Sequence, residues 1–211
     1  MEITQDIQRL ALLAVPFFLG ITCHEFAHGY VSMLFGDPTA KNAGRLTLNP
    51  LKHLDPIGTL ALIVTQMIGW AKPVPIDPRY YRNPRQGILL VSLAGPVANI
   101  LLAILFYLFY HSLLSFGEIF SPHWQQVFIV PLAAIAVYGV MVNVMLGIFN
   151  LIPIPPLDGS KIMACLLPPK AAASYMRLER YGFLIILGLA LLKVFQRTLG
   201  VAAAFIYQLL F

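Results

Sequence analysis

The stretch that decides the fold is residues 10–35, LALLAVPFFLGITCHEFAHGYVSMLF. At about 1.5 Å of rise per residue, a helix of this length crosses the hydrocarbon layer of a membrane, about 30 Å thick. Glu25 is its only Asp, Glu, Lys or Arg, but it also contains His24 and His28. Ionisable side chains inside a membrane helix are costly unless they are paired or bind a metal. The stretch therefore predicts both a membrane span and a functional site within it.

The composition of the whole chain agrees with a membrane protein. Of its 211 residues, 59% are hydrophobic and only 11% are charged, whereas soluble domains have about 25% charged residues. The mean hydropathy of +0.78 implies more apolar surface than one soluble core could bury. The net charge of +5 does not indicate nucleic-acid binding, because the Lys and Arg residues are spread between apolar runs. Two cysteines, Cys23 and Cys165, are too few for a disulfide framework.

Further apolar segments follow the first one. Residues 87–110 and 127–152 contain no Asp, Glu, Lys or Arg and are long enough to cross a membrane. Residues 57–71 are uncharged but short, which predicts a re-entrant or interfacial segment. Residues 181–192 and 198–211 are also short and allow either a hairpin or one broken helix. We predict an all-α polytopic membrane protein, a bundle of about four to six membrane segments with a possible re-entrant segment and a short membrane-associated β element.

Charge bias predicts the orientation of these segments. Positive residues flank 57–71 on both sides, at Lys41, Arg45 and Lys52 before it and at Lys72, Arg79, Arg82 and Arg85 after it. Cytoplasmic loops carry an excess of Lys and Arg, so both flanks belong to the cytoplasmic side. The connection 111–126 has Glu118 and no Lys or Arg, which places it outside. The first span then runs inward from an external N-terminus.

The motif His24-Glu25-Phe26-Ala27-His28 predicts a metal site. Its i, i+4 spacing places both imidazoles on one face of a helix, one turn apart, where they can bind the same zinc ion. The intervening Glu25 can reach a water on that ion and act as its base. A pair of polar residues packing between helices is the alternative, but three ionisable groups within one span favour metal binding.

A hydrolytic zinc usually has three protein ligands, so a third must come from elsewhere in the chain. The candidates are His53, Asp55, His111, His123 and Asp158. Asp158 ranks first because it follows a span that ends on the same side as the His24 helix. It also follows a proline-rich run, 153–156, that breaks the helix and can hold a carboxylate at membrane depth. Asp55 ranks second.

Residues 150–159, NLIPIPPLDG, resemble the N-x-x-P-x-x-x-x-D-G motif of the site-2 protease family, whose members are intramembrane zinc metalloproteases. The H-E-x-x-H helix is similar to the first signature of that family, and both signatures occur in its order. The element GPVAN at 95–99 and the loop GRLTLNP at 44–50 are also similar to family elements. The resemblance covers about residues 10–159 and is to the small bacterial type without a PDZ or CBS domain.

The resemblance implies roles for individual residues. His24, His28 and Asp158 would be the ligands of one zinc ion per chain, and Glu25 would be the general base. Asn150 would position the substrate or polarise its carbonyl, although an interhelical hydrogen bond explains an Asn in a span equally well.

The remaining matched residues are expected to be structural. Gly95, Pro96 and Asn99 are predicted to serve close helix packing and a local bend. His53 and Asp55 are predicted to order the loop that follows the first span.

The function implied by the resemblance is hydrolysis of peptide bonds in or near the transmembrane segments of membrane-anchored substrates, such as anti-sigma factors or other regulators. The protein would be a multi-pass protein of the cell membrane with a single domain, residues 1–211, whose catalytic core is about 10–159 and whose C-terminal segments are about 181–211. A non-catalytic metal-binding membrane protein, either a transporter or a degenerate protease, is the alternative. The alternating residues 43–49 could form a strand edge for an unwound substrate, although a plain cytoplasmic loop explains them equally well.

The predicted orientation can be tested with reporter fusions. A reporter inserted within residues 72–85 should show cytoplasmic activity, and one inserted within 111–126 should show external activity, because positive loops stay inside. External activity of the first fusion would reverse the orientation.

Overall fold

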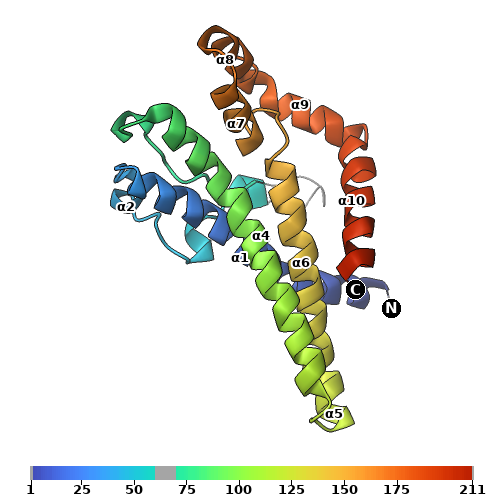
Figure 1. Cartoon of the computed structure of the whole chain (residues 1–211). Helices are drawn as coiled ribbons and strands as arrows, with labels where there is room; N and C mark the ends of the chain where they lie inside the picture. Colours follow the sequence, from blue (N-terminus) through green and yellow to red (C-terminus); the bar gives the residue numbers. More distant parts are fainter. Residues whose placement is uncertain (1, 60–69, 211) are drawn as a thin grey trace.

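The computed structural model of the protein describes residues 2–59 and 70–210. These residues form a predominantly helical chain, shown in Figure 1. Its helices are α1 (Glu2–Leu34), α2 (Thr39–Asn42), α4 (Pro84–Gly117), α5 (Pro122–Trp124), α6 (Val130–Asn150), α7 (Asp158–Leu166), α8 (Pro169–Met176), α9 (Glu179–Leu191) and α10 (Val194–Leu210). Short 3-10 turns occupy η1 (Pro50–Lys52) and η2 (Pro78–Tyr80), and a π-helical segment, η3 (Gln125–Ile129), joins α5 to α6.

The centre of the fold is a bundle of the three longest helices. α4 packs against both α1 and α6, and α1 packs against α6. Figure 1 shows α4 and α6 running side by side over most of their length. α7 packs on α4 near its N-terminal end and on α8, which extends the structure beyond that end of the bundle.

The three predicted full spans are confirmed. The structure has three helices long and apolar enough to cross a membrane, at Leu10–Leu34, Pro84–Gly117 and Pro122–Asn150. The second and third extend further than predicted, so most of the connection 111–126 is helical. Within this connection, the residues that disfavour a helix are Gly117 and Pro122. Pro122 is the first residue of α5, a position at which proline is well tolerated.

Polar residues lie inside the bundle together with smaller apolar ones, and many large apolar side chains lie outside. The fully buried side chains include Thr22, Asn99 and Asn143, whereas Leu101 and Leu105 of α4 are 57% and 61% exposed. A soluble bundle has the opposite arrangement, because water would solvate the polar groups. The arrangement suits helices whose outer faces contact lipid and whose inner faces bury interhelical hydrogen bonds. The protein is therefore a multi-pass membrane protein.

The close approach of α4 and α6 depends on a small residue. A Cβ atom at Gly139 of α6 would overlap the ring of Phe106 on α4. Small residues at such crossings allow membrane helices to pack by van der Waals contact, which is their main attraction in the absence of a hydrophobic driving force.

The C-terminal segment is a broken helix rather than a hairpin. α9 and α10 meet at Leu192 and Lys193, where Lys193 has a φ of 56°. This left-handed conformation ends α9, and Figure 1 shows α10 leaving it at a sharp bend. α10 then packs against α6, in part through the rings of Phe149 and Phe195.

The β-type pairing differs from the predicted edge strand. Residues 43–49 form turns and irregular backbone, with no strand assigned to them in the described part of the chain. Instead, Leu54 and Ala71 form an isolated antiparallel bridge, and the Lys72 N–H donates to the His53 carbonyl at 2.9 Å. The two flanks of the predicted re-entrant segment 57–71 therefore lie side by side, while residues 60–69 themselves lie outside the described ranges.

A buried carboxylate connects the end of α1 to the segment before α4. Asp37 is fully buried and accepts hydrogen bonds from the Ser32 hydroxyl at 2.7 Å, the Asp77 N–H at 2.8 Å, and the N–H and hydroxyl of Thr39. The Tyr81 hydroxyl in turn donates to Ser32 Oγ. Burial opposes ionisation, but these hydrogen bonds outweigh it and hold the pKa of Asp37 below its ordinary value.

Replacement of Asp37 by Asn should destabilise the protein. Whichever way the amide faces, its NH₂ opposes the backbone N–H of either Thr39 or Asp77, which costs about 1–3 kcal/mol per unsatisfied buried group. Thermal unfolding in detergent at neutral pH should show the loss, with Glu118→Gln, at an exposed position after α4, as a control of smaller effect. A carboxylate with a depressed pKa stabilises above its ordinary pKa of about 4 and loses this effect as pH falls. The difference between wild type and Asp37→Asn should therefore shrink in acid, and a constant difference would contradict this account.

Candidate metal centre

Three predicted ligands converge in the interior of the bundle. His24 and His28 lie one turn apart on α1, and Asp158 is the first residue of α7. The Nε2 atoms of the two histidines are 3.0 Å apart, and Asp158 Oδ2 lies 3.2 Å from that of His24 and 3.0 Å from that of His28. All three side chains are buried, with 5–8% of each residue exposed. Residues 130 positions apart therefore meet at one point.

The partners of the two imidazoles determine their tautomers. His28 Nδ1 lies 2.7 Å from the Val91 carbonyl, which can only accept, so Nδ1 carries the proton. His24 Nδ1 lies 2.7 Å from Asn99 Oδ1. The orientation of the Asn99 amide follows from its NH₂, which donates to the Gly20 carbonyl at 3.1 Å. Both histidines therefore turn an Nε2 lone pair towards Asp158.

A polar chain through the bundle supports this arrangement. The NH₂ of Asn99 also donates to Asn143 Oδ1 at 3.0 Å, and the NH₂ of Asn143 donates to the Gly139 carbonyl at 2.9 Å. The chain thus links α1, α4 and α6 at the level of His24. A hydrogen bond to the distant nitrogen of a ligand histidine sets its tautomer and raises its basicity.

The donor set fits a zinc ion. Two lone pairs and a carboxylate oxygen facing one another repel unless a cation lies between them. Bonds of about 2.0–2.1 Å in tetrahedral geometry place ligand atoms about 3.3 Å apart, close to the separations here. Gly95 leaves the space open, because a Cβ atom there would lie within 2.6 Å of both Nε2 atoms. Among the described residues, His24, His28 and Asp158 are the His, Cys, Asp or Glu cluster that could hold a metal.

Local backbone geometry explains how Asp158 reaches the histidines. The loop after α6 contains the run Pro153–Pro156, which has no N–H at three of its four positions. Gly159 then lies directly against the Leu151 carbonyl, where a Cβ atom would clash. Only glycine therefore allows α7 to begin so close to the end of α6, which explains the Asp-Gly pair of the motif.

Glu25 follows His24 directly on α1 and is not part of the ligand cluster. Its Oε2 accepts a hydrogen bond at 2.8 Å from the N–H of Val74, in the segment that precedes α4. Pro73 and Pro75 on either side lack an N–H, so this short stretch offers a single backbone donor, and it is directed at Glu25. A carboxylate held next to a metal site in this way can accept a proton from water.

The other candidate ligands lie elsewhere. His53 is fully buried and its Nε2 donates to the Thr47 carbonyl at 2.8 Å, while Asp55 accepts from the backbone N–H groups of the two residues after Pro56. Both order the loop, as predicted. His111 packs against Tyr107, and His123 contacts Trp124 at the far end of the bundle.

Asn150 also lies outside the cluster. Its NH₂ donates to the Leu146 carbonyl of its own helix at 3.0 Å, so the predicted interhelical hydrogen bond is absent from its described contacts.

Sequence reasoning missed part of the support. Asn99 was expected to serve packing, but it orients His24, and Asn143 was not singled out. Asn143 is one of two amides, with Asn150, in the otherwise apolar helix α6, which is a detectable signal. The contacts of Val91 and Val74 are made by backbone atoms, so the identity of these residues could not have predicted them.

Helices that enclose two histidines, an aspartate and a neighbouring glutamate define a membrane-embedded metalloprotein with hydrolase-type chemistry. Comparison with known proteins agrees, because Peptidase family M50 matches residues 12–192. The chain belongs to this family, whose metal is zinc.

Two relatives illustrate the similarity. The chain is 41% identical to the "Putative zinc metalloprotease YwhC" of Bacillus subtilis, over 83% of this chain and 78% of that protein. It is 32% identical to the "Putative zinc metalloprotease Rip2" of Mycolicibacterium smegmatis, over 88% of this chain and 69% of that protein. No solved structure matches.

Asn99→Ala should weaken zinc binding by about 10–100-fold, because it leaves His24 without the partner that orients it. Titration of detergent-purified protein against a zinc chelator measures the change. Asn150→Ala is the matched control and should leave the affinity unchanged, while Asp158→Ala should lose zinc almost completely. Equal affinities of Asn99→Ala and wild type would show that the bond to His24 has no such role.

Proposed function

We propose that this protein is an intramembrane zinc metalloprotease that hydrolyses peptide bonds in or near the transmembrane segments of membrane-anchored proteins. The observation that supports this best is the position of Glu25, next to a ligand set buried within the bundle. Metal transport does not require a base beside the ion, and a protease that had lost its activity would lack the base or a ligand. His24, His28 and Asp158 are the proposed zinc ligands.

The proposed reaction uses the residues of the chain as follows. Zinc, when bound, supplies a Lewis acid for the water and for the scissile carbonyl. Glu25 accepts a proton from the water and transfers it to the leaving amine. The Val74 N–H holds the Glu25 carboxylate in place during both transfers. The second N–H of the Asn150 amide, whose first is bonded to Leu146, is the proposed donor to the substrate carbonyl.

The position of the site constrains the substrate. A transmembrane helix hides its peptide bonds in its own hydrogen bonds, so a substrate must unwind before attack. Segments that contain Gly, Pro or Asn unwind at lower cost and are the expected substrates. Membrane-anchored regulators such as anti-sigma factors are the proposed partners, released by cleavage of their spans.

Glu25→Gln is the variant that tests the proposed function. The amide keeps the shape of the side chain but accepts no proton, so cleavage of a single-span test protein with Gly and Pro in its span should fall by about 10²–10⁴-fold. Zinc content should stay at the wild-type value, because Glu25 is not among the ligands.

Glu118→Gln is the matched control, since Glu118 is exposed beyond the end of α4 at the opposite end of the bundle. Both cleavage and zinc content should be unchanged in this variant. Cleavage by Glu25→Gln at the wild-type rate would reject the role of Glu25. Zinc in the wild type without cleavage of any span tested would favour a non-catalytic metal-binding protein.

A further inference from the structure

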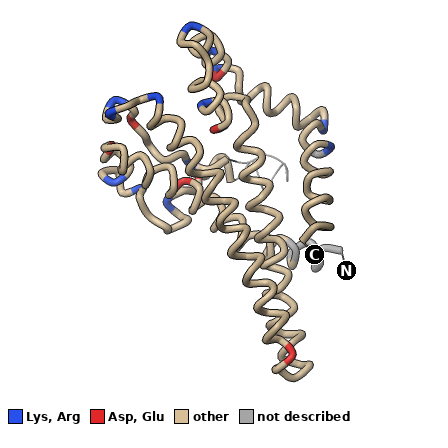
Figure 2. The backbone as a smooth tube through the Cα atoms, in the orientation of Figure 1, with Lys and Arg blue, Asp and Glu red and all other residues tan. Residues whose placement is uncertain are grey.

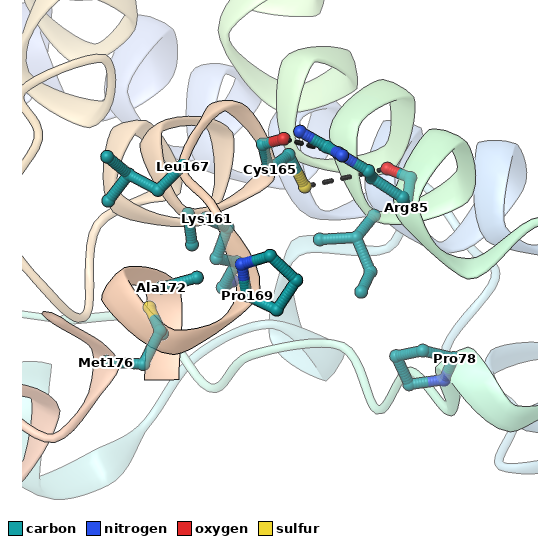
Figure 3. Close-up of a pocket in the computed structure, with 10 residues that line it drawn as sticks. Pro78, Arg85, Lys161, Cys165, Leu167, Pro169, Ala172 and Met176 are labelled. Carbon is teal, nitrogen blue, oxygen red and sulfur yellow. Dashed lines mark hydrogen bonds between the residues drawn. The ribbon is translucent and has the colours of Figure 1, made fainter. Parts of the chain in front are cut away.

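A cavity of about 480 Å³ lies outside the metal centre, between the N-terminal end of α4 and the helices α7 and α8 (Figure 3). Its walls are mainly apolar and include Ile88, Leu167, Ala172 and Met176. Cavities of about 300–1,000 Å³ with such walls are typical of small-molecule sites. The lining predicts that at least part of an occupant is hydrocarbon.

Two cations, Arg85 and Lys161, also line this cavity. Arg85 Nε donates to the Cys165 carbonyl at 2.6 Å, which fixes the guanidinium beside the cavity, as Figure 3 shows. A guanidinium has five N–H donors, and this bond uses one. The Lys161 side chain is 43% exposed and its Nζ lies 3.3 Å from Asp158 Oδ1. Both cations can therefore bind a further anionic group.

The position of the two cations in the sequence shows where the membrane surface lies. No Lys or Arg occurs between Arg85 and Lys161. Arg85 and Lys161 therefore border the long stretch that contains the second and third spans. The fold brings both residues to one cavity. Arg85 is in the first turn of a membrane-spanning helix. Figure 2 shows the Lys and Arg residues gathered towards this end of the bundle. In the orientation that charge bias predicts, this end of the bundle faces the cytoplasm, so the cavity belongs to the cytoplasmic surface of the membrane.

The charges on the lining helices are strongly unequal. α4, α7 and α8 contribute Arg85, Lys161 and Lys170, and their single carboxylate is Asp158, which is buried against the histidines. An occupant that complements this cavity has an anionic head and an apolar tail, and it reaches the site from the membrane. Basic pockets beside membrane helices on the cytoplasmic side bind anionic lipid headgroups.

We propose that this cavity binds an anionic phospholipid, with its phosphate held by Arg85 and Lys161 and an acyl chain against Ile88, Leu167 and Met176. The phosphate takes the remaining guanidinium donors of Arg85 and draws the Lys161 ammonium towards the cavity. The proposal is independent of proteolysis, since it depends only on the shape, charge and position of the cavity.

Native mass spectrometry of delipidated, detergent-purified protein tests the proposal. The probes are phosphatidylglycerol, which is anionic, and phosphatidylcholine, which is zwitterionic. One phosphatidylglycerol should bind more tightly than any phosphatidylcholine. Each juxtamembrane cation contributes about fivefold to the affinity for an anionic surface, so Arg85→Gln/Lys161→Gln should weaken phosphatidylglycerol binding by about 25-fold.

Two further variants make the result specific. Arg85→Lys/Lys161→Arg keeps both charges and should retain the preference for phosphatidylglycerol, even if the bond from Arg85 to Cys165 is lost. Lys193→Gln/Arg197→Gln removes two exposed cations at the start of α10 and should leave the affinity unchanged. Circular dichroism and gel filtration verify that each variant is folded.

Four results would overturn the proposal. Equal binding of the two lipids, or an unchanged affinity in Arg85→Gln/Lys161→Gln, would show that the cations select no headgroup. Binding of glycerol 1-phosphate with the affinity of the whole lipid would assign the cavity to a free anion. Displacement of phosphatidylglycerol by a short soluble acidic peptide would assign it to a protein partner.

Discussion

The rest of the structure depends on bringing two imidazole nitrogens and a carboxylate oxygen to within about 3 Å of one another inside a low-dielectric bundle. These atoms repel unless a cation lies between them, so the surrounding helices must hold them in place. α1 supplies His24 and His28 at helical spacing, and α7 supplies Asp158 from a loop that proline and Gly159 shape. Packing among the three long helices therefore has to be exact at this level.

α4 provides no proposed ligand and yet determines most of the site. Its Val91 carbonyl sets the tautomer of His28, and its Asn99 amide sets that of His24. Gly95, between these two positions, leaves the space in which the ion fits. Asn143 of α6 in turn bonds Asn99, so the site also depends on a helix that supplies no proposed ligand. Such support explains how a metal centre is kept rigid in lipid.

The residues on the exterior of the bundle suit contact with the membrane and supply no proposed ligand of the metal centre. Large apolar side chains face outward along α4 and α6, and cations gather towards one end of the bundle. The proposed lipid cavity lies at that end, and Lys161 contacts both this cavity and the Asp158 carboxylate. The membrane surface and the metal centre thus share one side chain.

The sequence alone determined the local features: three spans from uninterrupted apolar runs, a His pair from i, i+4 spacing, and the Asp-Gly pair as a partner motif. Each follows from contacts between neighbours in the chain. The sequence ranked Asp158 first as the third ligand, and tertiary structure decided among the candidates, since His53 and Asp55 bond within their own loop. It also decided the role of Asn99, the bond from Val74 to Glu25 and the bend between α9 and α10. These features arise from backbone atoms and distant residues that meet only after the helices pack. The residue type at a single position therefore does not predict them.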